Sequence, residues 1–96
     1  MSILYTLSKS PTHKQLDSCS RYLDNGDALL FIQDGVYHCV DENLLANLDS
    51  KFPLYALKED IAARGLGDKI LESLEPVSYR KFVELCTQYD KVVSWF

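Results

Sequence analysis

The sequence predicts a single α/β domain with a mainly parallel sheet of about four to five strands and helices on both faces. Short apolar runs alternate along the chain with segments whose apolar residues recur at spacings of three and four. This alternation is typical of strands joined by crossover helices. The chain has 96 residues, 47% hydrophobic and 25% charged, which fits one folded domain spanning residues 1–96.

The chain begins with a predicted strand, helix and strand. Residues Ile3 to Leu7 form a β-rich run, and the following Pro11 removes a backbone donor and breaks regular pairing. From Thr12 to Asp24 the apolar residues recur at helical spacing, and Gly26 is the expected left-handed residue at the helix end. Ala28 to Gln33 is almost continuously apolar, as expected for a strand that helices cover on both faces.

The segment after the second strand is ambiguous. Residues Asp34 to Val40 can extend a strand or begin a short helix. Gly35 is expected to turn the chain with a positive φ, while Asp34 bonds neighbouring amides. Glu42 to Leu48 again has helical spacing, and Asp41 is expected to cap that helix.

The second half repeats the alternation of strands and helices. Acidic Glu59 and Asp60 precede a predicted short helix that closes with Gly65, as the helix dipole and the preference for glycine at helix ends favour. The predicted elements in order are a strand at Pro53 to Leu57, a helix at Ile61 to Leu66, a strand at Val77 to Tyr79, a helix at Arg80 to Asp90 and a strand at Lys91 to Phe96.

A parallel sheet carries its functional loops at the carboxyl ends of the strands. Here those loops are Ser8 to Pro11, Gln33 to Gly35 and Lys58 to Asp60. A receiver-like site at Asp34 lacks the second acid that it would need after the first strand. No glycine-rich dinucleotide fingerprint or phosphate-binding loop is present.

Charge and composition exclude several classes of function. A net charge of −4 and a pI near 5.0 argue against direct binding of nucleic acid, which favours a basic surface. No signal-peptide leader or membrane-length apolar run is found, so we expect a cytoplasmic protein with no membrane contact. His13 and His38 lack partners at metal-ligand spacing, and we expect neither a metal nor a cofactor. Small domains gain stability by association, so the isolated chain can self-associate.

The three cysteines are expected to be reduced thiols, because they are odd in number, widely separated and without a C-x-x-C pair. Cys19 is the candidate for sulfur chemistry, in which a thiolate attacks a donor persulfide and then carries the outer sulfur. It also lies on the apolar stripe of its predicted helix, which favours packing in the core over sulfur chemistry and leaves a place in an interface as a third interpretation. Cys39 and Cys86 are expected to be structural.

Several segments together resemble the TusB/DsrH family. They follow one another along essentially the whole chain: Ile3 to Pro11, Asp27 to Val36, Tyr55 to Leu66, and an ending with Tyr79, Phe82-Val83 and Ser94-Trp95-Phe96. The resemblance implies a DsrE-like α/β fold. It also implies assembly with TusC/DsrF-type and TusD/DsrE-type subunits into a dimer of heterotrimers that passes persulfide sulfur between carriers.

The resemblance leaves two branches open. In the TusB branch the sulfur goes toward the 2-thio group of the wobble uridine in transfer RNA, and in the DsrH branch it belongs to sulfur oxidation. In both, the principal acceptor cysteine looks to reside in the TusD/DsrE-type partner, which implies a structural, non-catalytic role for this chain. Cys19 matches a cysteine of DsrH-like members that some TusB-like members lack, so it does not choose the branch.

Three hypotheses from different classes follow. The chain is a structural subunit of a sulfur-relay complex, or a direct persulfide carrier through Cys19, or an unrelated small α/β binding module. Trp95 and Phe96 close the chain with two large aromatic side chains, which we expect to pack against the sheet or against a partner.

Overall fold

Five strands form one sheet in the order β4-β3-β2-β1-β5, and every neighbouring pair is parallel. The computed structural model describes residues 1–48 and 51–95, so Phe96 lies outside the described residues. The strands are β1 (Ile3–Leu7), β2 (Ala28–Phe31), β3 (Leu54–Leu57), β4 (Leu74–Val77) and β5 (Lys91–Trp95). The predicted parallel sheet of four to five strands is confirmed.

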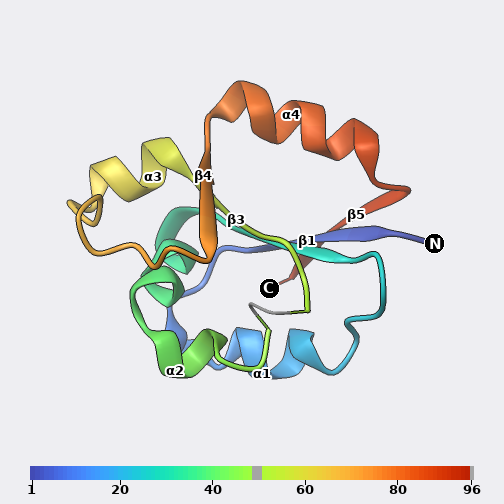
Figure 1. Cartoon of the computed structure of the whole chain (residues 1–96), viewed down its shortest axis with the longest axis horizontal. Coiled ribbons are helices and arrows are strands. Elements are labelled where there is room, and N and C mark those ends of the chain that lie inside the picture. Colours follow the sequence, from blue (N-terminus) through green and yellow to red (C-terminus); the bar gives the residue numbers. More distant parts are fainter. Residues whose placement is uncertain (49–50, 96) are drawn as a thin grey trace.

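Helices cover both faces of this sheet, as predicted (Figure 1). From β1 to β4 the strands are added in one direction, and the chain then returns across the sheet to β5 beside β1. Right-handed crossovers therefore place α4 on the face opposite the earlier helices. The helices are α1 (Gln15–Ser20), α2 (Glu42–Leu45), α3 (Lys58–Ala63) and α4 (Tyr79–Gln88), with 3-10 segments η1 (Pro11–His13) and η2 (Gln33–Val40).

The sheet separates two apolar clusters, because successive side chains of a strand point to opposite faces. In β1, Tyr5 and Leu7 belong to the larger cluster under α1, η2, α2 and α3, whereas Leu4 belongs to the smaller cluster under α4. All residues of β2 are buried. The central strand is thus covered on both sides, as its continuous apolar sequence predicts.

The first helix is shorter than the predicted span of Thr12 to Asp24. Pro11 begins the 3-10 segment η1 instead, and Lys14 then takes a left-handed φ of 53° before α1 starts. The chain leaves the helix after Ser20. Gly26 does have a positive φ of 93°, but it lies in the turn before β2 rather than at the helix end.

Other boundaries differ by a few residues. The helix predicted to end at Leu48 ends at Leu45, although its predicted cap is confirmed by the Asp41 side chain, which accepts a hydrogen bond from the Asn43 amide. Gly65 follows the end of α3, as predicted, and has a positive φ of 66°. The fourth strand is Leu74–Val77, whereas the predicted strand ran from Val77 to Tyr79. The strand ends before Ser78, because the Ser78 side chain caps α4 by accepting a hydrogen bond from the Lys81 amide at 3.1 Å.

Candidate functional site at the carboxyl edge of the sheet

The loops after β1 and β2 touch at Gly35. A β-carbon at this position would lie 2.0 Å from the carbonyl oxygen of Leu7, which is backbone and has little freedom to move. The predicted positive φ at Gly35 is wrong, since the positive-φ glycines of the described residues are Gly26 and Gly65. Gly35 is required by close approach of two backbones, and the left-handed residue of this loop is Gln33, with a φ of 50°.

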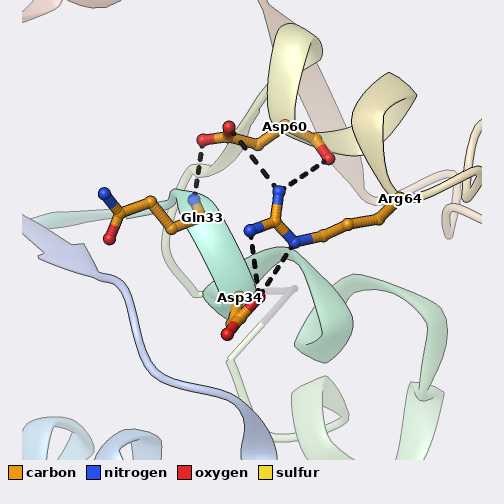
Figure 2. A network of polar contacts seen from close by, with 4 residues as sticks. All are labelled: Gln33, Asp34, Asp60 and Arg64. Carbon is orange, nitrogen blue, oxygen red and sulfur yellow. Dashed lines mark hydrogen bonds and ion pairs between the residues drawn. The ribbon is translucent and has the colours of Figure 1, made fainter.

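The loop after β2 is tied to α3 by the network in Figure 2. The Gln33 amide donates a hydrogen bond to Asp60 Oδ2 at 2.7 Å, and the Gln33 side chain points away from the other residues drawn. Arg64 donates from Nε and Nη2 to Asp34 Oδ1 at 3.0 and 2.9 Å. Arg64 Nη1 also donates a hydrogen bond to the backbone carbonyl oxygen of Asp60 at 3.3 Å. Asp34 therefore binds a guanidinium from another element, whereas the sequence predicted bonds to neighbouring amides.

The loop after β1 is tied to the end of β5 through a buried glutamine. Gln15 Oε1 accepts a hydrogen bond from the Lys9 amide at 3.1 Å, and Gln15 Nε2 donates to the carbonyl oxygen of Trp95. The Trp95 ring is half-buried and packs edge-on against Tyr5 and tilted against Tyr22. The expectation that Trp95 and Phe96 pack against the sheet or a partner stays a prediction, and Phe96 lies outside the described residues.

The two histidines have different surroundings. His13 is exposed at the end of η1. His38 is buried, stacks on Phe31 with ring centroids 5.2 Å apart, and its Nδ1 donates to the carbonyl oxygen of Gly35 at 2.9 Å. Burial lowers the pKa of His38, so the neutral ring is the form that this site holds.

Two of the three thiols are inside the core. Cys19 and Cys39 are both 0% exposed, and burial raises the pKa of each thiol to about 12. For Cys19 the nearby charge of Asp27 raises the pKa further. Cys86 on α4 is partly exposed, and burial raises its pKa as well. At neutral pH these thiols are therefore protonated, and a protonated thiol is a poor nucleophile.

Sequence reasoning missed residues that hold this edge together. Asp60 directly precedes the predicted helix and Arg64 lies within it, four positions later and with the opposite charge, so this spacing could have drawn attention to the pair. Gln15 has no comparable sequence signal, because its partners are a loop amide and the last strand. At the opposite, amino end of the strands, sequence reasoning also missed buried Asp27, which accepts hydrogen bonds from the Ile3 and Asp24 amides.

Among the described residues, the site is a polar surface without a cavity. No pocket is found among residues 1–48 and 51–95, and no group of three or more potential ligand side chains there could hold a metal ion. No described helix has the length and apolar character to cross a membrane. The carboxyl edge thus presents side chains already bonded to one another.

Known proteins similar to this chain match it over most of its length. Residues 9–92 match the family described as DsrH like protein. Protein TusB of Pectobacterium carotovorum subsp. carotovorum is 41% identical over 95 residues, covering 97% of this chain and 100% of that protein. Protein TusB of Photorhabdus laumondii is 39% identical and Protein TusB of Salmonella arizonae 41% identical, each with the same coverage.

One solved structure shows the same fold. The crystal structure of the ychN protein from E. coli covers 99% of this chain and 100% of its own, with a TM-score of 0.75 and 12% sequence identity. At that identity the likeness concerns the fold alone, and it confirms the expected DsrE-like architecture.

Proposed function

Because this chain belongs to the DsrH-like family, we propose that it is a subunit of a sulfur-relay complex that serves thiolation of transfer RNA in the cytoplasm. The observation that carries the proposal is the full-length likeness to proteins named TusB, which favours the transfer-RNA branch over sulfur oxidation. The hypothesis of an unrelated α/β binding module is wrong, since the family match covers most of the chain.

The proposed partners are TusC/DsrF-type and TusD/DsrE-type subunits in a dimer of heterotrimers, as the family resemblance implies. The chain's net charge of −4 fits a subunit that leaves the binding of nucleic acid to other proteins. In this proposal the persulfide is carried by a cysteine of the TusD/DsrE-type partner.

The role proposed for this chain is structural rather than catalytic. Transfer of sulfur requires a thiolate to attack the outer sulfur of a donor persulfide while the donor leaves as a thiolate. A direct role for Cys19 would need an accessible thiolate, whereas Cys19 is fully buried with a pKa raised to about 12. This burial supports the structural role over the alternative of a Cys19 carrier in a DsrH-type complex.

Coexpression with both proposed partners tests the assembly. Native mass spectrometry should find the chain in a complex that contains two copies of each of the three subunits. A chain that remains separate from both partners when all three are soluble would refute the proposal.

A reconstituted thiolation assay tests the role of Cys19. Replacing Cys19 by Ala should leave the complex assembled and the formation of thiolated transfer RNA close to that of the parent, with a loss of stability on the order of 1 kcal/mol. Cys86→Ala is the matched control on the opposite face of the sheet. If Cys19→Ala abolished transfer in an intact complex, and a persulfide were trapped on Cys19 in the parent, this chain would be a direct carrier.

A further inference from the structure

The two edges of the sheet are protected to different degrees. At the β4 edge, Pro76 has no amide hydrogen to offer a further strand, and Glu75 is exposed beside it. The opposite edge is β5, Lys91–Trp95, which contains no proline and pairs only with β1 among the described residues. The edge at β5 is therefore open to a further strand.

The backbone groups that face this open edge can be assigned from the pairing with β1. The Lys91 amide donates to the carbonyl oxygen of Ser2 at 3.2 Å, so Lys91 directs its backbone groups toward β1. Backbone groups alternate in direction along a strand. Val93 and Trp95 consequently face β1 as well, whereas the N–H and C=O groups of Val92 and Ser94 face outward.

Exposed apolar side chains border this edge on both faces of the sheet. Val92 is 41% exposed on the face that α4 covers. On the other face Tyr22 is 64% exposed and lies against the half-buried Trp95, with ring centroids 5.3 Å apart. An open strand between exposed apolar side chains is the usual form of a site for strand addition.

We propose that β5 pairs antiparallel with β5 of a second copy of this chain, about a two-fold axis at Val93. In this register Val92 lies opposite Ser94 of the second copy, so that the outward N–H and C=O groups of both residues find partners. Two sheets then join edge to edge. The proposal goes beyond the proposed function, because it concerns what the chain does on its own.

The sequence of β5 fits a second copy because it is complementary to itself about Val93. Val93 meets Val93 of the second copy as an apolar cross-strand pair, and Lys91 lies opposite Trp95, where an ammonium can contact an aromatic face. No two like charges stand opposite each other in this register. A shift by one residue would bring inward-facing backbone groups against the partner and leave the outward groups unpaired.

Proline at Ser94 tests the pairing in the full chain. Ser94→Pro removes an outward amide that β1 does not use, and proline is tolerated at an edge strand. Sedimentation equilibrium over concentrations up to about 100 µM should show a dimer of the parent, and the proline variant should weaken it about tenfold or more. Ser94→Ala is the control, because it keeps the amide and removes only the hydroxyl that accepts from Thr6.

Disulfide trapping tests the register without relying on a disruptive variant. In the proposed pairing the Cα atoms at position 93 face each other as a non-hydrogen-bonded pair, a separation that a disulfide can span. Val93→Cys should form a covalent dimer with diamide, which takes up the two electrons and two protons released by the two thiols. Val92→Cys lies opposite Ser94 rather than itself and should remain uncrosslinked, as should the parent with its native cysteines.

The proposal is overturned if the folded parent chain sediments as a monomer throughout the series. It is equally overturned if the dimer withstands Ser94→Pro, or if Val92→Cys crosslinks as readily as Val93→Cys. A strand of a different subunit found at β5, with no self-pairing of the isolated chain, would also replace it. Circular dichroism of each variant ensures that a lost dimer reflects the edge rather than unfolding.

Discussion

At position 35 the fold has no room for a side chain. Gly35→Ala would place a β-carbon 2.0 Å from the Leu7 carbonyl oxygen, and the loops after β1 and β2 would have to separate. We expect a decrease in the free energy of unfolding of about 3 kcal/mol or more, measured by urea denaturation. Gly67→Ala is the matched control, because a β-carbon there has no neighbour within 4 Å. Equal stability of the two variants would contradict the close approach.

The thiols make a second prediction at this scale. In the native protein at pH 8, iodoacetamide should react only with the partly exposed Cys86. Cys19 and Cys39 should not react, because burial holds these thiols protonated with pKa values of about 12. In urea all three should react. Mass spectrometry of peptides identifies the labelled residue, and Cys86→Ala should remove the native reaction. Rapid labelling of Cys19 in the folded chain would show that it is accessible.

The structural role of a residue could be predicted from the sequence where that role depends on residues nearby in the chain. The cap at Asp41 and the place of Gly65 just after a helix depend on neighbours within a few positions, and both are confirmed. Gly35 was singled out for the wrong reason, because its constraint comes from Leu7 in another strand. The left-handed conformation of Gln33 could not be predicted, since its amide bonds to Asp60 across the sheet edge.

Among the elements, α3 and the loop after β2 are joined by two carboxylates of unequal importance. Asp60 has a 23% exposed side chain and bonds a backbone amide in a left-handed residue, whereas Asp34 is 61% exposed. Asp60→Ala should lower the free energy of unfolding by about 1–2 kcal/mol. Asp34→Ala should cost less than about 1 kcal/mol, because water screens an exposed ion pair.

Thermal denaturation at low and high salt separates these two contributions. The small effect of Asp34→Ala should vanish at high ionic strength, while most of the effect of Asp60→Ala should remain because it rests on a hydrogen bond. Comparable losses for both variants under both conditions would mean that Asp34 and Asp60 hold the loop equally.

Element types were predictable and element ends were less so. The alternation of apolar periods predicts five strands, yet the fourth was placed at Val77 to Tyr79 and not at Leu74–Val77, because Pro76 argues against a strand at its position. The first helix was overextended since Leu23 continues the apolar spacing after the chain has left α1. Leu23 packs against the core from a turn, and its spacing in the sequence is the same as that of a residue on the apolar face of a helix.

For the whole molecule, β1 holds the ends of the chain together. It pairs with β2 on one side and with the last strand on the other, and Ser2 exchanges hydrogen bonds with Asp90 before β5 begins. The sheet order is a consequence of this long return, which the sequence pattern alone does not specify. The resemblance to a known family implied the DsrE-like fold without a strand order, and the apolar periodicity predicted helices on both faces of the sheet.

The stability of the folded chain should depend on His38 in mild acid. Burial is the main reason that the pKa of His38 is lowered from 6.5, while the hydrogen bond with Gly35 and the charge of Asp17 act in the opposite direction. The unfolded chain takes up a proton at this histidine as the pH falls through 6.5, but the folded protein keeps the ring neutral until a lower pH. Below pH 6.5 the unfolded state binds more protons, and the free energy of unfolding decreases.

Urea denaturation between pH 8 and pH 5 measures this dependence against two variants. His38→Asn keeps a donor for the Gly35 carbonyl and cannot titrate, so its stability should fall less between pH 6.5 and pH 5 than that of the parent. The difference cannot exceed about 1.4 kcal/mol per pH unit for one proton. His13→Asn, at an exposed position, should follow the parent. Parallel profiles for the parent and His38→Asn would show that the buried ring takes up its proton as readily in the folded protein as in the unfolded chain.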